Sequence, residues 1–340
     1  MGKKIGFLLV GIVLVTLFTI TCIPSSAAAE PIKLNFASFG PVKSFPNVQM
    51  ERWKSEVEKR TGGKVSIKTF PAETLLAAKA IYDGVAAGQA NIGSLCMAYQ
   101  PGRFIVTNAT SLPVGLPDTR VASLTLWDLY NKYKPKEFAE VKVLTMFTCP
   151  LSNIISKKAV RKLEDLKGLD LRASGGAAQI LKAWGANPVG MPMPATVEAL
   201  QKGVVQGLFS SLETLKDLKF AEYCPYVTMT DTVIYPFSNV MNMDTWNSLP
   251  KDVQKVIDDM GREHSEWVGK YNDDYWKKCV EWAKKNHNTE IITLSDQEKA
   301  RWDKLVEPII NQWIEDANAK GFPGKAIVDD IRAFAKKNAK

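Results

Sequence analysis

The stretch GLDLRASGGAAQ, residues 168–179, joins a strand to a helix. Its first half alternates apolar and polar side chains, as a half-buried strand does, and places Arg172 near the end of that strand. Two glycines and the first turn of a helix follow, where free N–H groups favour an anion. Two interpretations of Arg172 are open. Its guanidinium either binds a carboxylate through paired hydrogen bonds or forms a surface ion pair with Glu164 or Asp170.

The same alternation of strand and helix runs through much of the chain and predicts an α/β protein. In the first half the predicted elements are strands at 32–37, 64–70 and 90–96 and helices at 46–60 and 77–87. This order is typical of parallel strands joined by helical crossovers. We expect one lobe over residues 30–150 and a second over 151–235. A strand-like return segment, at about 236–250, is expected to rejoin the first lobe.

Residues 250–288 predict one unusually long helix. Apolar side chains recur there at three- and four-residue spacing. At 1.5 Å per residue such a helix is over about 50 Å long, too long for one small lobe, so we expect it to cross both. His264 falls on its apolar stripe, which favours a buried core histidine over a catalytic one. Residues 289–340 are predicted to form C-terminal helices.

Residues 1–29 have the three parts of a secretory signal peptide. Lys3 and Lys4 precede an apolar run over 5–20, and small residues lead to a cleavage site after Ala29. The run is shorter than the roughly 20 residues that span a membrane. Cys22 leaves a lipoprotein anchor as an alternative, although the residues before it match that signal poorly. We expect a soluble protein exported to the periplasm.

The composition argues against several classes of function. The net charge of +8 falls to +6 once Lys3 and Lys4 are removed, and no basic stripe suggests nucleic acid. The chain has two histidines and lacks the H-E-x-x-H, P-loop and G-x-S-x-G motifs. We therefore expect a binding cleft with no catalytic residues, metal or cofactor. Spacing leaves open whether the four mature cysteines pair; they are Cys96, Cys149, Cys224 and Cys279.

Several ordered motifs resemble the solute-binding subunits of TRAP transporters, the DctP-like proteins. They are DLKGLDLRASGGAAQILKAWGANPVGMP, EALQKGVVQG, WKSEVEKRTGGKVSIKTFP, AAGQANIG and WNSLPKDVQKVI. The resemblance covers essentially the whole mature chain. It implies a two-lobed periplasmic-binding-protein fold with a ligand cleft between the lobes. It also implies a monomer that captures an organic acid and delivers it to an ion-gradient-driven permease, with Arg172 holding the carboxylate.

Departures from the sialic-acid-binding branch of that family suggest a less polar ligand. Ser152 and Asn153 stand near the place of a second arginine, Ser210 replaces an asparagine, and Phe39 and Cys96 replace polar groups. The expected ligand-binding residues are Arg172, Ser38, Phe39, Cys96, Tyr99, Ser152, Asn153, Ser174, Met193, Ser210, Glu213 and Tyr235. For the apolar members, core packing is the alternative.

This lining predicts a monocarboxylate with an apolar or aromatic body, or a small oxo or hydroxy acid. A sugar acid would bury many hydroxyls, and each one left unmatched costs about 1–3 kcal/mol. Two other functions share the predicted fold: a ligand-sensing partner of a receptor, and a periplasmic enzyme of the same shape.

Overall fold

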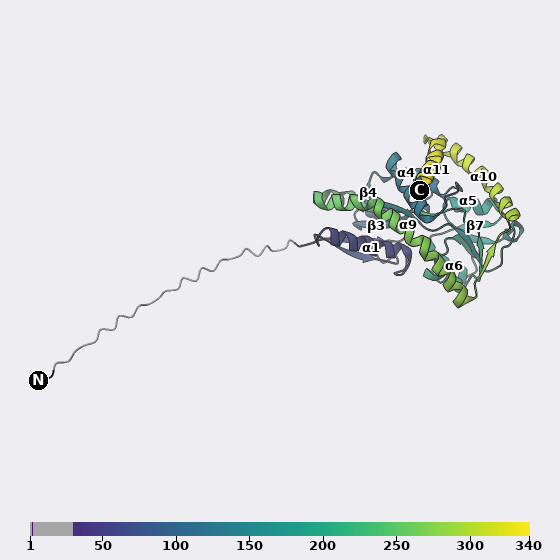
Figure 1. The fold of residues 1–340 in the computed structure, drawn as a ribbon, viewed down its shortest axis with the longest axis horizontal. Helices are drawn as coiled ribbons and strands as arrows, with labels where there is room; N and C mark the ends of the chain where they lie inside the picture. Colours follow the sequence, from purple (N-terminus) through teal and green to yellow (C-terminus); the bar gives the residue numbers. More distant parts are fainter. Residues whose placement is uncertain (1, 3–29) are drawn as a thin grey trace. The chain divides into compact units, whose positions relative to one another are not determined.

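The computed structural model describes Gly2 and residues 30–340. The predicted signal peptide and Cys22 therefore fall outside the described residues. Residues 31–340 form one unit that contains two mixed β-sheets with helices packed around them (Figure 1). The predicted α/β fold with two lobes is confirmed.

The first sheet has the strand order β2-β1-β3-β10-β4. Its strands are β1 (Ile32–Ser38), β2 (Val65–Phe70), β3 (Ile92–Cys96), β4 (Val141–Thr148) and β10 (Pro236–Asn242). β1 runs parallel to β2 and β3, whereas β10 lies antiparallel between β3 and β4. The return segment thus supplies an inner strand of the first lobe. This lobe includes the helices α1 (Phe45–Arg60), α2 (Ile81–Ala86), α3 (Ile105–Asn108), α4 (Thr119–Tyr133) and α8 (Met243–Ser248).

The second sheet has the order β11-β9-β5-β8-β6-β7. Its strands are β5 (Asn153–Ser156), β6 (Asp170–Ala173), β7 (Asn187–Gly190), β8 (Gly207–Ser210), β9 (Tyr226–Met229) and β11 (Glu290–Thr293). The helices of this lobe are α5 (Gly176–Ala183), α6 (Thr196–Gln201) and α7 (Thr214–Asp217). The stretch 289–340, predicted to form C-terminal helices, also begins with the strand β11, which the sequence did not predict and which pairs in parallel with β9. A four-residue strand between two long helices is too short to show its own period.

Two stretches of chain cross between the sheets side by side. The first leads from β4 to β5 and the second from β9 to β10. The N–H of Cys149 donates to the carbonyl of Tyr235 over 3.2 Å, and that of Ser152 to Val233 over 2.7 Å. These hydrogen bonds hold the crossings together and fix Tyr235 at the junction of the lobes.

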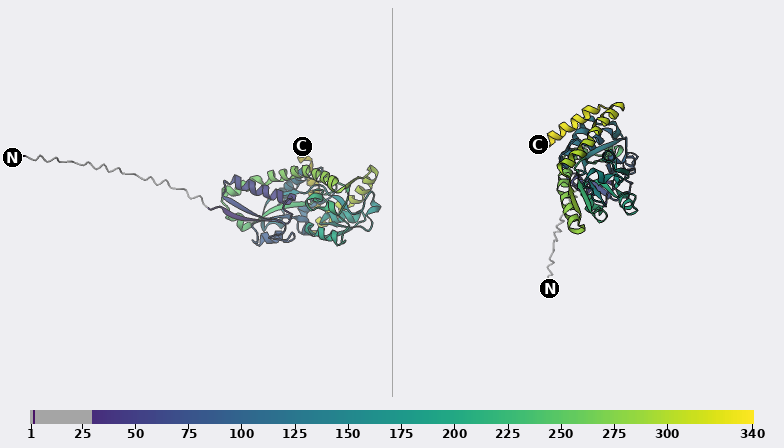
Figure 2. Two further views of the ribbon diagram at one scale, coloured as in Figure 1. Left: turned by 90° about the horizontal axis from the view of Figure 1, so that it is seen from below. Right: turned by 90° about the vertical axis from the view of Figure 1, so that its right-hand side faces the viewer.

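The long helix α9 (Lys251–His287) is a third connection between the lobes. It packs on α1, α4 and β4 of the first lobe and on α7 of the second. Figure 2 shows it running along the edge of the body formed by residues 31–340. Gly269 permits the close approach to α4, because a Cβ there would meet the backbone of Arg120. Crossing both lobes provides the apolar contacts that a helix of this length needs.

His264 on α9 is a buried core histidine, as the sequence predicted. Its Nε2 lies 2.9 Å from Oε1 of Gln49, and its Nδ1 lies 2.9 Å from a guanidinium nitrogen of Arg52. Burial, with the Arg52 charge beside it, lowers its pKa to about 3. The imidazole is therefore neutral and fully partnered, which suits a structural role.

The C-terminal helices α10 (Asp296–Ala319) and α11 (Gly324–Asn338) pack on the second and first lobes respectively, against α5 and α4. None of the helices in the described part of the chain is long and apolar enough to cross a membrane. The cysteines at 96, 149, 224 and 279 are all buried and unpaired. Free buried thiols are therefore the interpretation that this structure supports.

Candidate ligand-binding site

A cavity lies between the lobes, where strands from both sheets end. The room inside it for water-sized molecules is about 50 Å³. In open α/β sheets, ligands bind beyond the carboxyl ends of the strands. The lining is largely apolar and comes from both lobes: Phe39, Gly40, Pro41, Ser44, Phe45, Pro46, Cys96, Tyr99, Cys149, Arg172, Met193, Pro194, Ser210, Ser211, Glu213, Thr214, Asp217, Leu218, Tyr235 and Phe237.

Arg172, on β6, is the one basic side chain among these lining residues. It is only 1% exposed. Its Nε donates to the carbonyl of Met191 over 2.9 Å, and Nη2 donates to Oγ of Ser174 over 3.1 Å. Ser174 in turn donates to the same Met191 carbonyl over 2.9 Å. These neutral contacts fix the plane of the guanidinium without neutralising its charge.

The alternative of a surface ion pair for Arg172 is wrong. Glu164 pairs with Arg301 at 2.6 Å, and Asp170 accepts a hydrogen bond from the Asn187 side chain at 3.1 Å. Within residues 30–340, no carboxylate oxygen lies within 4.0 Å of the Arg172 guanidinium. A buried charge normally has a counter-ion. The structure therefore leaves this cation open to a bound anion.

Aromatic rings form the wall on the first-lobe side. Phe39 contacts Tyr99 edge-on at 5.4 Å between centroids and stacks with Phe237 at 6.2 Å. The guanidinium carbon of Arg172 lies 5.9 Å from the ring centre of Tyr99 and 5.8 Å from that of Tyr235. Both distances permit a cation–π contribution. The rings suit a flat apolar ligand whose anionic end faces Arg172.

The two tyrosines also connect parts of the site. The N–H of Met193 donates to Oη of Tyr99 over 3.2 Å, which joins the second lobe to the first. Tyr235 donates its hydroxyl to the carbonyl of Phe209 over 2.9 Å and accepts from the N–H of Ser174 over 3.4 Å. Burial raises the pKa of Tyr235 to about 12, so it stays a neutral phenol.

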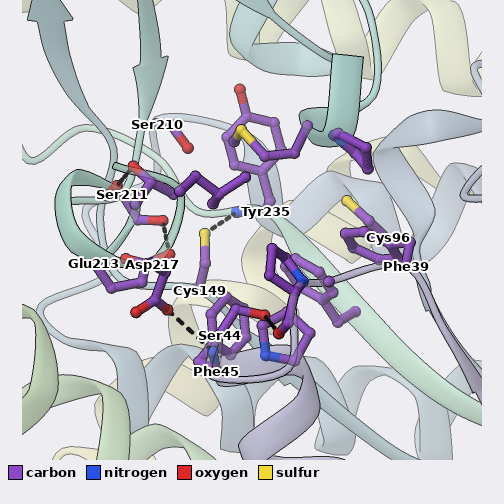
Figure 3. A pocket seen from close by; sticks show the side chains of 18 of the residues that line it. Phe39, Ser44, Phe45, Cys96, Cys149, Ser210, Ser211, Glu213, Asp217 and Tyr235 are labelled. Atoms are coloured by element: carbon purple, nitrogen blue, oxygen red, sulfur yellow. Dashed lines mark hydrogen bonds between the residues drawn. The ribbon is translucent and has the colours of Figure 1, made fainter. Parts of the chain in front are cut away.

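Two carboxyl groups lie together on the second-lobe side (Figure 3). Glu213 is 2% exposed, and burial raises its pKa to about 8. Asp217 accepts hydrogen bonds from the Tyr275 hydroxyl at 2.7 Å and from the Phe45 N–H at 3.2 Å, across the lobes. Burial raises the pKa of Asp217 to about 6. At neutral pH this side of the cavity therefore holds a mostly protonated Glu213.

Comparison with known proteins agrees with this architecture. Residues 36–316 match the family described as bacterial extracellular solute-binding protein, family 7, or DctP. The chain belongs to this family. A TRAP periplasmic solute-binding protein from Desulfovibrio salexigens is 54% identical, with a TM-score of 0.80 over 90% of this chain and 96% of that one. That structure is described as an open complex with the C-terminus of a symmetry mate in its ligand-binding site.

Two further TRAP solute-binding proteins of known structure contain aromatic acids. One from Rhodoferax ferrireducens, in complex with copurified benzoate, is 26% identical, with a TM-score of 0.87 over 91% of this chain and 98% of that one. One from an unidentified marine microbe, in complex with 3-hydroxybenzoate, is 27% identical, with a TM-score of 0.87 over 92% and 100% of the two chains. The resemblance to TRAP solute-binding subunits is thus confirmed.

The structure brings most of the predicted site residues of this DctP-family chain into one cavity. Those that line it are Arg172, Phe39, Cys96, Tyr99, Met193, Ser210, Glu213 and Tyr235. Ser174 lies beside them through its hydrogen bond to Arg172. Ligand contact by each of them stays a prediction.

Three predicted residues lie outside the lining of this cavity, and ligand contact by them stays a prediction. Ser38 is the last residue of β1 and is fully buried outside the cavity lining, whereas Phe39, the next residue, lines the cavity. Asn153 uses its side-chain oxygen for the N–H groups of Thr230 and Asp231, at 2.6 and 3.0 Å. Ser152 is buried in the first crossing, outside the cavity lining.

Sequence reasoning missed several lining residues, chiefly Cys149, Ser211, Asp217, Phe45 and Phe237. Phe45 begins the helix directly after β1, a position that the strand-to-helix rule could have identified. Ser211 and Asp217 follow β8, so the same rule could have identified them. Cys149 lies in the first crossing and Phe237 on the antiparallel strand β10. Local sequence carries no signal for these two, because the crossings bring together residues far apart in the chain.

Proposed function

We propose that this protein captures a monocarboxylate with an aromatic or otherwise apolar body, or a small oxo or hydroxy acid, and delivers it to the permease of a TRAP transporter. It would act as a monomer in the periplasm, exported by the signal peptide at residues 1–29. The observation that carries the proposal is the buried guanidinium of Arg172, which has no counter-ion among the described residues and sits in a cavity walled by aromatic rings.

Charge balance supports an acid as the ligand. A ligand carboxylate would neutralise Arg172 and form charge-assisted hydrogen bonds with it. The copurified benzoate of the Rhodoferax relative is such an acid. The C-terminus held in the Desulfovibrio relative also ends in a carboxylate. Both observations concern those proteins, and they support a carboxylate as the ligand group in this one as well.

The rest of the lining supports a single carboxylate on an apolar body. A dicarboxylate would bring its second charge into a cavity that already holds Glu213 and Asp217. A sugar acid would need partners for many hydroxyls, which Phe39, Phe237 and Cys96 do not supply. An aromatic ring of a ligand would instead leave water and pack against the surrounding aromatic side chains.

Thermal melts of refolded, ligand-free protein against a library of organic acids would test the proposal. A ligand at 1,000 times its dissociation constant stabilises the folded state by about 4.1 kcal/mol. At roughly 2–4 °C per kcal/mol, that corresponds to a rise in melting temperature of about 8–16 °C. We expect this rise with aromatic or small oxo acids and its loss in Arg172→Ala.

Arg52→Ala is the matched control, because Arg52 is a partly buried arginine that contacts His264 and Glu263 outside the cavity. It should keep the ligand-induced rise. Rises with dicarboxylates or sugar acids alone would contradict the proposed ligand class. A rise that persists in Arg172→Ala would contradict the role of the guanidinium.

Delivery and export have separate tests. Mass spectrometry of the secreted protein should show a mature chain that begins at Glu30. Uptake of the bound acid by cells should require both this protein and the permease, and the acid should be recovered chemically unchanged. Conversion of the acid by the purified protein would instead favour an enzyme.

A further inference from the structure

One carboxyl oxygen in the cavity lacks a partner. Oε1 of Glu213 accepts a hydrogen bond from Oγ of Ser211 over 2.6 Å. Oε2 of the same carboxyl is buried and has no hydrogen-bond partner in the described part of the chain. Nearly all buried polar side-chain atoms in native proteins have a partner. An unpartnered oxygen on a cavity-lining residue therefore indicates that a group of the bound ligand hydrogen-bonds there.

The neighbouring charged groups do not fill this role. Asp217 is an acceptor and already receives the Tyr275 hydroxyl and the Phe45 N–H. Arg172 lies on β6 while Glu213 follows β8, the adjacent strand, and no ion pair within 4.0 Å joins them. The cavity thus has a cation without a counter-ion in one place and a carboxyl oxygen without a partner in another.

We propose that Glu213 determines specificity by hydrogen-bonding a hydroxyl group on the body of the ligand, apart from the carboxylate that Arg172 holds. This inference rests on the proposed function and narrows it. The ligand class becomes a hydroxylated aromatic or apolar monocarboxylate, of which a hydroxybenzoate or a hydroxyphenylacetate is a simple representative.

The state of Glu213 favours a neutral partner. Burial, with the Asp217 carboxylate nearby, raises its pKa to about 8, so the carboxyl is largely protonated at neutral pH. A protonated carboxyl both donates and accepts, as a hydroxyl does, so the two groups match. A second ligand carboxylate would be repelled by Asp217, and an ammonium group would require Glu213 to lose its proton.

Calorimetric titration with matched pairs of acids tests the assignment at pH 7. The probes are benzoate against 3- and 4-hydroxybenzoate, and phenylacetate against its 3- and 4-hydroxy derivatives. In the wild type we expect at least one hydroxylated acid to bind about tenfold or more tightly than its parent, since a site built to bond a hydroxyl rejects the analogue that lacks it.

Substitutions at residue 213 then assign that preference. Glu213→Leu should bring the ratio of the affinities for the hydroxylated and the parent acid close to one. Glu213→Gln, which keeps a donor and an acceptor, should retain part of the ratio. Glu137→Gln is the control, because Glu137 is also partly buried with a raised pKa but lies outside the cavity. It should leave the ratio unchanged.

The outcomes separate the two proposals. Equal binding of parent and hydroxylated acids by the wild type, or a ratio that survives Glu213→Leu, would overturn the assignment and leave the acid-binding function intact. Preferential binding of 4-(aminomethyl)benzoate would also overturn it, in favour of an ionised Glu213. If no acid bound the wild type, both proposals would fall.

Discussion

Two buried polar regions of this molecule differ in one respect. The first is the Gln49 cluster, which lies between α1, β10 and α9 and consists of Gln49, Arg52, Asn239 and His264. Its polar side chains hydrogen-bond to one another. Nε2 of Gln49 donates to the Pro46 carbonyl at 2.8 Å, and Oε1 accepts from Asn239 at 2.8 Å. In the cavity, Arg172 has no counter-ion and Glu213 has a free oxygen within the described residues.

The comparison shows how to distinguish structure from function in a buried site. A polar cluster that partners itself stabilises one packing of the chain, whereas one that leaves groups unpartnered is complete only with a ligand. The residue types alone would mislead, since a histidine with a strongly shifted pKa belongs to the first region. The following predictions test this distinction, from the largest expected effect to the smallest.

The two regions should give opposite pH dependences of stability. Folding raises the pKa of Glu213 from 4.5 to about 8, so its contribution is full below pH 4.5 and is lost as the pH rises through 8. The loss should be roughly 3–5 kcal/mol. His264 acts in the opposite sense. Folding lowers its pKa from 6.5 to about 3, so its contribution to the stability of the protein is full above pH 6.5 and is lost as the pH decreases through 3.

Urea unfolding of the ligand-free protein between pH 3 and 8 measures both contributions to the unfolding free energy. Glu213→Gln should flatten the fall in unfolding free energy above pH 5, and a slope identical to that of the wild type would show that Glu213 is ionised in the folded state. His264→Gln should change the pH dependence of the unfolding free energy only below about pH 6.5.

Gln49→Leu should break the self-partnered cluster. It would leave Asn239 and the Nε2 of His264 without their partner, so we expect the unfolding free energy to fall by about 2–3 kcal/mol. Ligand affinity should stay within twofold, because Gln49 does not line the cavity. A large loss of affinity with unchanged stability would reverse the roles assigned to the two regions.

Arg172→Met should change stability and ligand affinity in the reverse pattern to Gln49→Leu. Removing a buried charge without a counter-ion should raise the unfolding free energy of the ligand-free protein by about 1–2 kcal/mol while it removes acid binding. Chemical unfolding and calorimetry on the same preparation would check both. Destabilisation comparable to that of Gln49→Leu would place Arg172 among the structural groups.

Tyr275→Phe should give the smallest change. It removes one hydrogen bond to Asp217, whose carboxylate also accepts from the Phe45 N–H across the lobes. We expect a loss of about 1 kcal/mol in stability and a reduction of about fivefold in affinity, because Asp217 lines the cavity and joins the two lobes through the Phe45 N–H. Tyr271→Phe, on the same helix, is the control, and an equal effect there would argue against a specific role for Asp217.

Sequence reasoning predicted the regular elements better than the cavity wall. The βα pattern, the long helix and the position of Arg172 follow from local periodicity and strand-end rules, which act over a few residues. β11 was missed because four residues between helices show no clear period. Ser38 and Asn153 lie outside the cavity lining, because tertiary packing and hydrogen bonding decide their surroundings.

The sequence by itself determined the α/β class, the helix that crosses both lobes, the family and the place of Arg172 near the end of a strand. Only the tertiary structure decided that Arg172 has no counter-ion, that Glu213 keeps a free oxygen, and that Cys149 and Phe237 join the wall. The physical reason is the distance along the chain over which each feature is set. Periodicity is set by neighbours along the chain, whereas burial and partnering are set when the two crossings bring distant strand ends together.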